Sequence, residues 1–134
     1  MSQYVTDTHA LYWHLANNPR LSPATRQVFH DADAGLHQVL VPGIVLIEMA
    51  YLVEKGRLDA VLIDQVFALF DIVAGSYVIA SLDQHTARAL LSIPRSAVPD
   101  MPDRIIAATA YQLGLPLITR DAAIHKADVV PVIW

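Results

Sequence analysis

Four carboxylic acids in this chain form the ligand set of a metal site: two follow predicted strands, one starts a predicted helix and one lies within a helix. They are Asp7, Glu48, Asp103 and Asp121. Hard divalent cations such as Mg²⁺ and Mn²⁺ prefer carboxylate and water oxygens as ligands. Four carboxylates close together would repel one another and raise each other's pKa values without a cation. If the fold brings these side chains together, the sequence predicts a pocket that binds one or two such ions. Such ions would activate a water molecule to attack a phosphodiester bond.

Three of these acids also have a simpler, structural explanation. Asp7 and Asp121 each precede a predicted helix, where an aspartate that caps the helix contributes about 1 kcal/mol. In the segment VPDMPDRIIAATA, Asp100 is a candidate N-cap, and Asp103 is an acid in the first turn that the helix dipole favours. Capping alone would therefore account for these residues without any catalytic role.

Glu48 has no such explanation, because it lies in the middle of the apolar segment VPGIVLIEMAYLV. No Lys or Arg lies one turn before it, the residue one turn after it is Leu52, and Lys55 is two turns away. An ionised carboxylate on a buried helix costs several kcal/mol unless it is paired or bound to metal. The alternative is that Glu48 faces solvent on a narrow polar stripe.

The elements that must position these acids alternate short strands with longer helices. Strands are predicted at 3–6, 38–41, 77–80, 117–119 and 129–133, and helices at 8–16, 23–34, 42–55, 58–70, 84–91 and 102–113, with a short helix opening at Asp121. This alternation predicts one α/β domain over residues 1–134, with a central parallel sheet of four to five strands covered on both faces. Ligands bind outside the carboxyl ends of such strands, where Asp7 and Asp121 would lie if their strands are neighbours.

The composition limits the class of protein. The 134 residues contain no Cys, which excludes disulfides and thiolate metal sites and favours a cytoplasmic protein. Acidic residues interrupt the most apolar region, and the start MSQYVTDTHA lacks a basic segment and a cleavage pattern, so we expect neither a membrane span nor a signal peptide. The net charge of −4 argues against binding of nucleic acid by bulk positive charge.

The apolar content, 54% of residues, is high for a soluble domain. The segment from Ile44 to Phe70, which includes Tyr51 and Phe67, has more apolar positions than one buried helix face needs. This excess predicts a surface that is buried in a homodimer, by a protein partner, or by both.

Several segments resemble those of PIN-domain proteins, specifically the small VapC-like toxins of bacterial toxin–antitoxin pairs. The matching segments are YVTDTHALYW, VPGIVLIEMAYL, PDMPDRIIAATAYQLGLPLITRD and VVPVIW. They span essentially the whole chain, and the third is the most specific. The resemblance implies a three-layer α/β/α PIN-like fold and a Mg²⁺- or Mn²⁺-dependent endoribonuclease. It also implies a cognate antitoxin protein as partner, and often a homodimer.

By the family pattern, the acidic quartet consists of Asp7, Glu48, Asp103 and Asp121, and Asp100 matches an extra acid that some members have. The chain departs from many relatives at His9, where a small residue is common. His9 is either a partly exposed helix residue or a contact for substrate or partner.

The resemblance also suggests roles for residues beside the acids. Thr6 and Thr119 stand where hydroxyl groups orient the site in this family. Arg104 and Arg120 are candidates for contact with substrate phosphates, and the alternative for both is a surface salt bridge.

Other classes fit less well. The six histidines, such as His9 and His14, lack metal-ligand spacing and are interpreted as ordinary residues. An aspartyl phosphatase needs a second Asp two residues after the first, where this chain has His9, and Lys126 is misplaced for a phospho-receiver domain. The main alternative is a non-catalytic PIN-like module that binds RNA or protein, although inactive copies usually lack one of the acids.

Overall fold

The computed structural model describes residues 2–72 and 75–134, and its centre is a parallel sheet of five strands in the order β3-β2-β1-β4-β5. All four pairs of neighbouring strands run parallel. The strands are β1 (Ser2–Thr6), β2 (His37–Pro42), β3 (Tyr77–Ala80), β4 (Leu117–Ile118) and β5 (Val132–Ile133). The predicted α/β class is therefore confirmed, with five strands.

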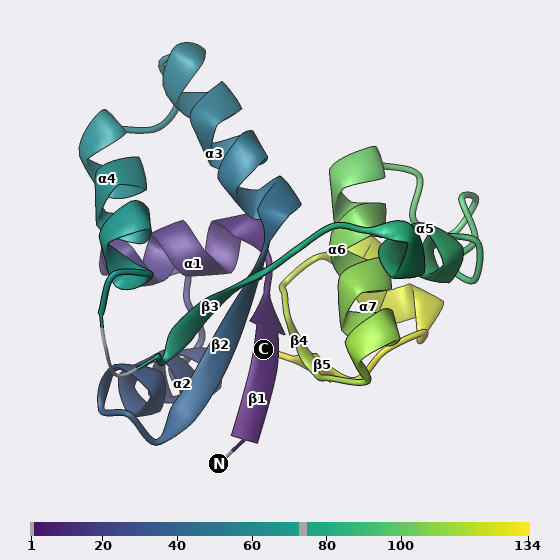
Figure 1. Ribbon diagram of the computed structural model, residues 1–134, viewed down its shortest axis with the longest axis horizontal. Helices are drawn as coiled ribbons and strands as arrows, with labels where there is room; N and C mark the ends of the chain where they lie inside the picture. Colours follow the sequence, from purple (N-terminus) through teal and green to yellow (C-terminus); the bar gives the residue numbers. More distant parts are fainter. Residues whose placement is uncertain (1, 73–74) are drawn as a thin grey trace.

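Seven helices among the described residues connect the strands and form two outer layers. They are α1 (Thr8–Leu15), α2 (Pro23–Asp33), α3 (Gly43–Glu54), α4 (Ala60–Leu69), α5 (Gln84–Leu90), α6 (Met101–Leu113) and α7 (Ala122–Ala127). The chain moves from β1 to β3 toward one edge of the sheet and then crosses to β4 and β5 at the other. Because such crossovers are right-handed, the first four helices lie on one side and the last three on the other, as Figure 1 shows. This arrangement confirms the predicted three layers.

Most predicted boundaries agree with the structure within one residue, but two differ by more, and local chemistry explains both. Helix α4 begins at Ala60 rather than at 58, because the side chain of Asp59 accepts a hydrogen bond from the backbone N–H of Val61 and caps the helix. Strand β5 covers only Val132–Ile133, not 129–133. Before it, Asp128 ends α7 in the left-handed conformation with φ of 53°, and Pro131 has no N–H to donate to a strand.

The core is formed where the central strands and the surrounding helices meet. Its largest fully buried side chains come from both outer layers and from the sheet; they include Phe29, Leu11, Met49, Ile93, Ile106, Leu117 and Ile118. At the carboxyl ends of β1 and β2, which are covered on both sides, two successive residues of each strand are buried. This packing fixes the positions of the strand ends that carry the acidic residues.

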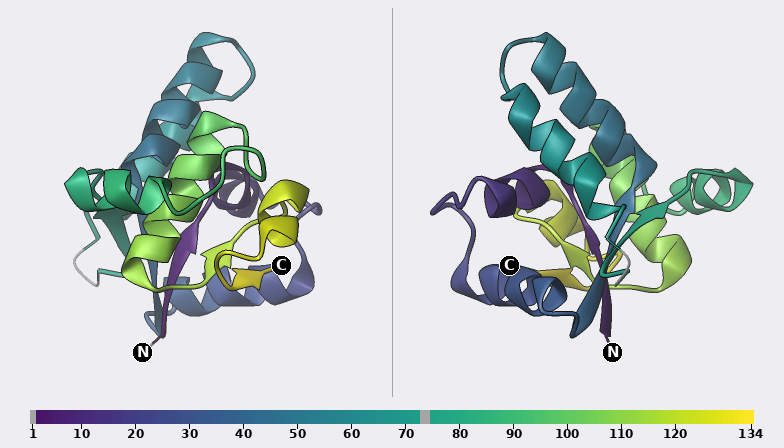
Figure 2. Two further views of the ribbon diagram at one scale, coloured as in Figure 1. Left: turned by 90° about the vertical axis from the view of Figure 1, so that its right-hand side faces the viewer. Right: turned by 60° about the vertical axis from the view of Figure 1, so that its left-hand side comes forward.

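Helices α3 and α4 form an antiparallel pair that extends beyond the sheet (Figure 2). Several apolar side chains of this pair are exposed: Ile47 by 64%, Tyr51 by 58%, Val61 by 57% and Phe67 by 47%. Phe70, in contrast, is partly buried and packs against the core. Within the described part of the chain, no helix is long and apolar enough to cross a membrane.

Candidate active site

Asp7 and Asp121 lie at the same edge of the sheet, because β1 and β4 are neighbouring parallel strands. Asp7 follows β1 directly, and its backbone N–H donates to the carbonyl of Ile118 over 3.1 Å. Asp121 follows β4 after two residues, Thr119 and Arg120. The predicted condition for a shared site, that the two strands are neighbours, is therefore met.

The Asp7 carboxylate is almost buried, with 8% of the residue exposed, and both of its oxygens are held. Oδ1 accepts a hydrogen bond from the backbone N–H of Ala10 over 2.8 Å, which caps α1. Oδ2 accepts one from the hydroxyl of Thr119 over 2.6 Å. Burial raises the pKa of Asp7, while the hydrogen bonds from Thr119 and Ala10 oppose that shift. Capping therefore coexists with a fixed position for this carboxylate at the strand edge.

The hydroxyl of Thr119 connects the two strand-end acids. Besides donating to Asp7, it accepts a hydrogen bond from the backbone N–H of Asp121 over 3.0 Å. Thr6 behaves differently: its hydroxyl donates to the backbone carbonyl of Asp7 over 3.1 Å and does not contact the carboxylate. Of the two threonines suggested by the sequence, Thr119 is the one that orients an acidic side chain directly.

The remaining capping interpretations also hold. Oδ1 of Asp121 accepts a hydrogen bond from the backbone N–H of Ile124 over 2.8 Å and caps α7. Oδ2 of Asp100 accepts one from the backbone N–H of Asp103 over 3.1 Å and caps α6. Asp103 is then the first-turn acid of α6. Asp103 lines the same pocket as Asp7 and Asp121.

The pKa of Asp103 is raised to about 7, mainly by burial and then by the negative charges of Asp100, Asp121 and Glu48 in that order. Such mutual repulsion requires the carboxylates to lie near one another in a medium that screens them poorly. Asp103 is therefore the meeting point of the acidic cluster.

Glu48 is partly buried on α3, and Oε1 of its carboxylate accepts a hydrogen bond from the hydroxyl of Thr8 over 2.6 Å. A neutral hydroxyl, rather than a cation, thus partners the acid that capping cannot explain. The sequence did not single out Thr8. The sequence feature that could have pointed to Thr8 is its position directly after Asp7, in the first turn of α1.

Three of the acids open into one pocket of about 340 Å³, which we call the acidic pocket. It is lined by Asp7, His9, Tyr12, Trp13, Arg20, Asp103, Arg120 and Asp121. Glu48 lines an adjacent apolar cavity instead, next to Met101 and Pro102 at the start of α6. His9 and Arg120, noted in the sequence, are at the pocket, while Tyr12, Trp13 and Arg20 were not anticipated because nothing in their spacing marks them.

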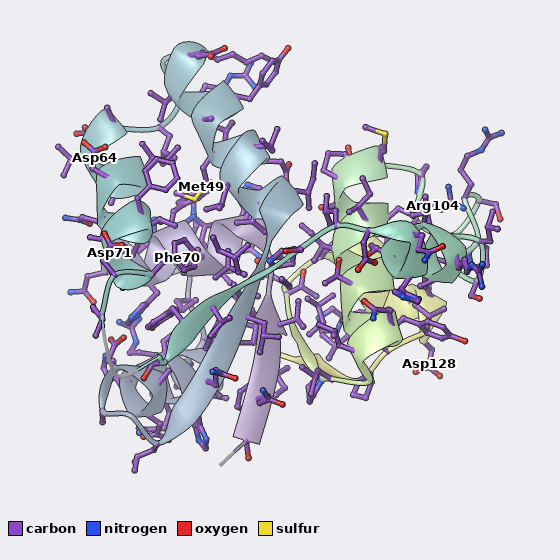
Figure 3. All side chains as sticks on the ribbon, viewed as in Figure 1. Met49, Asp64, Phe70, Asp71, Arg104 and Asp128 are labelled. Carbon is purple, nitrogen blue, oxygen red and sulfur yellow. The ribbon has the colours of Figure 1, made fainter. Side chains whose placement is uncertain are left out.

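Arg104 is not at the acidic pocket. Its guanidinium donates from Nε to the carbonyl of Ile93 over 2.8 Å and from Nη2 to the carbonyl of Leu90 over 3.0 Å. Figure 3 shows it on the side of α6 that faces α5. The suggested contact with substrate phosphates is thus replaced by a structural role, because the side chain secures the segment between α5 and α6.

The carboxylate oxygens of the acids suit Mg²⁺ or Mn²⁺ chemically, although the side chains are not spaced as metal ligands. Over residues 2–72 and 75–134, no three His, Asp or Glu side chains are arranged so that they could hold a metal ion as they stand. Asp103 nevertheless lies within the electrostatic influence of Asp100, Asp121 and Glu48, and a divalent cation would neutralise the negative charge of this group. Oxygen-only donors of this kind suit these hard cations.

Comparisons with known proteins agree with this architecture. The PIN domain family model matches residues 4–130. The chain is 28% identical over 136 residues to Ribonuclease VapC22 of Mycobacterium tuberculosis (strain ATCC 25618 / H37Rv), with 100% of both sequences covered.

Two solved structures show a similar fold. One is VapBC2 from Rickettsia felis bound to a DNA fragment from their promoter, with a TM-score of 0.72 and 13% identity over 98% of this chain and 97% of that one. The other is a toxin-antitoxin complex from Klebsiella pneumoniae, with a TM-score of 0.58 and 18% identity over 98% of this chain and 96% of that one. These two structures share the fold, and the family model, which matches nearly the whole sequence, shows that the chain belongs to the PIN domain family.

Proposed function

We propose that this protein is an endoribonuclease that hydrolyses RNA phosphodiester bonds at the acidic pocket and acts as the toxin of a toxin–antitoxin pair. The observation that supports it most strongly is the gathering of Asp7, Asp103 and Asp121 at the carboxyl edge of the sheet, with Glu48 close to Asp103. The full-length similarity to Ribonuclease VapC22 supports RNA as the substrate.

We further propose that Mg²⁺ or Mn²⁺ is the cofactor and that Asp7, Glu48, Asp103 and Asp121 hold it. When bound, such an ion activates water and neutralises charge at the reacting phosphate. Asp100 is the N-cap of α6, and its charge acts on Asp103. Its direct ligation is therefore not part of the proposal.

The protein's own contribution is to hold the acids in place before substrate arrives. Asp7 is fixed by hydrogen bonds from both Thr119 and Ala10. Glu48 is oriented by the hydroxyl of Thr8. Asp103 and Asp121 sit in or just before the first turns of two helices, where backbone N–H groups favour negative charge. Preorganised side chains of this kind avoid a reorganisation cost at the moment of reaction.

An antitoxin protein is the proposed partner. The two similar structures described above are complexes of such proteins. The exposed apolar side chains of α3 and α4 provide a surface that a protein partner or a second copy would bury.

The test is a digest of single-stranded RNA by purified protein with Mg²⁺ or Mn²⁺. We expect cleavage that EDTA abolishes and that Asp103→Asn or Asp7→Asn reduces by roughly a hundredfold or more. Asp64→Asn, an exposed acid on α4, is the matched control and should cleave normally. If Asp7→Asn and Asp103→Asn cut as fast as the wild type, the mechanism is wrong. Binding of RNA without any cleavage would favour the non-catalytic module.

A further inference from the structure

Two arginines at the rim of the acidic pocket share one aromatic ring. The Cζ atom of Arg20 lies 5.7 Å from the centroid of the Trp13 ring, and that of Arg120 lies 5.4 Å from it. Both arginines are exposed, whereas Trp13 is only 7% exposed. The indole is therefore covered, and the two guanidinium groups form the surface above it.

The three residues come from separate parts of the chain. Trp13 belongs to α1, Arg20 lies between α1 and α2, and Arg120 lies between β4 and α7. The Trp13 ring is itself held by edge contacts with Trp134, at 6.0 Å between centroids, and with His9, at 5.5 Å. An anchored ring thus gives two otherwise mobile side chains a defined position beside the acids.

Among residues 2–72 and 75–134, neither guanidinium is paired with a carboxylate, although three carboxylates line the same pocket. In the described ranges, the ion pairs are those of His14 with Asp33 and His37 with Asp31. Contact with an aromatic face uses the positive charge but leaves the in-plane N–H donors of a guanidinium available. Those donors match phosphate oxygens, which they can meet in pairs.

We propose that Arg20 and Arg120, supported by Trp13, form a clamp for backbone phosphates of the RNA strand beside the acidic pocket. The inference rests on the proposed function, because it assigns the clamp to the substrate of that site. The clamp would also let a protein of net negative charge bind RNA locally. The acids line the interior of the pocket, and the two arginines lie at its rim. Phosphate contacts position a strand without selecting its sequence.

The test measures binding apart from cleavage, in an Asp103→Asn background with fluorescently labelled single-stranded RNA and anisotropy over a range of salt concentrations. Each phosphate contact that is lost lowers the steepness of the plot of log affinity against log salt by about 0.7 for a single strand. We expect Arg20→Ala and Arg120→Ala each to weaken binding roughly tenfold and to lower the slope, and the double variant to do both further. Arg20→Lys should keep the salt slope of the background but bind more weakly than it does. It should still bind more tightly than Arg20→Ala, because an ammonium keeps the charge but lacks the planar, two-pronged donors of a guanidinium.

Arg57→Ala is the matched control, because Arg57 is exposed in the turn between α3 and α4, away from the acidic pocket. Its affinity and slope should equal those of the background. Unchanged affinity and slope in both Arg20→Ala and Arg120→Ala would overturn the clamp, even if the wild type cleaves RNA. If the wild type binds RNA without cutting it and the arginine variants still lose affinity and slope, the nuclease proposal fails while the clamp stands.

Discussion

The hydroxyl of Thr119 donates a hydrogen bond of 2.6 Å to Oδ2 of Asp7, although 112 positions separate the two residues in sequence. The same hydroxyl accepts a hydrogen bond from the backbone N–H of Asp121. One small side chain at the end of β4 therefore ties together the two acids that leave neighbouring strands.

Replacing Thr119 with Val should weaken both stability and activity. The buried Oδ2 of Asp7 would lose its donor, which costs about 1–3 kcal/mol, and misplacement of the carboxylate should lower RNA cleavage by roughly 10- to 100-fold. Urea unfolding and initial cleavage rates measure the two effects. Thr119→Ser keeps the hydroxyl and should retain most of both properties. Equal rates for the Val and Ser variants would contradict this role.

The raised pKa of Asp103 makes a prediction about stability and pH. Its pKa is about 7 in the folded protein, against 3.8 as the ordinary value for the unfolded chain. Between these values the unfolded chain binds fewer protons, so metal-free protein should lose stability as the pH rises from about 4 to 7, and the cost should stay constant above that. Asp103→Asn removes this cost.

We therefore expect Asp103→Asn to stabilise the metal-free protein by about 1 kcal/mol at pH 8, after allowance for screening of a partly exposed group, and to have little effect at pH 4. Thermal melts in EDTA at both values provide the measurement. Asp64→Asn, on the exposed side of α4, should show no such dependence. A destabilised Asp103→Asn at pH 8 would mean that the carboxylates do not repel one another as described.

Divalent metal should stabilise the folded protein, because the acids converge only when the chain is folded. At a metal concentration one hundred times the Kd, binding adds about 2.7 kcal/mol to the free energy of unfolding. A melting temperature that rises with Mn²⁺ in the wild type and much less in Asp103→Asn is the expected result. A melting temperature that does not change on addition of millimolar Mn²⁺ would contradict the proposed cofactor.

The hydrogen bond from Thr8 to Glu48 predicts a second orienting residue. Thr8→Val should reduce cleavage by roughly tenfold, because Glu48 would be free to adopt other rotamers near Asp103. Thr8→Ser preserves the hydroxyl and serves as the control. Since Glu48 is only partly buried, the folded state should survive, and circular dichroism checks that point. Wild-type rates for Thr8→Val would show that the contact is dispensable.

The exposed apolar residues on α3 and α4 predict association. Light scattering of the purified protein should show a homodimer, or a complex with a co-purifying partner. Ile47→Asp should weaken association, because it puts a charge where 64% of an isoleucine is exposed. Leu91→Asp, at a residue that is 83% exposed outside this pair of helices, is the control. A monomer at high concentration without any partner would contradict the prediction.

Most of the fold follows from local patterns in the sequence. Apolar runs of strand length alternate with helical spacing, and side chains such as those of Ser22, Asp83 and Asp100 cap the helices they precede. The errors at 58–70 and 129–133 lie at boundaries, where a single cap or proline decides the end of an element. The types and order of the elements, and so the α/β class, could therefore be predicted without coordinates.

The sequence also predicted the acids of the proposed site, since Asp7 and Asp121 were expected to follow strands and Asp103 to lie at the start of a helix. Only the tertiary structure decided that β1 and β4 are neighbours, that Thr8 holds Glu48, and that Arg104 faces away from the pocket. It likewise decided that Arg20 and Arg120 meet over Trp13. The physical reason is that backbone propensity acts over a few residues. Strand order and side-chain contacts between distant segments depend instead on how the whole chain packs.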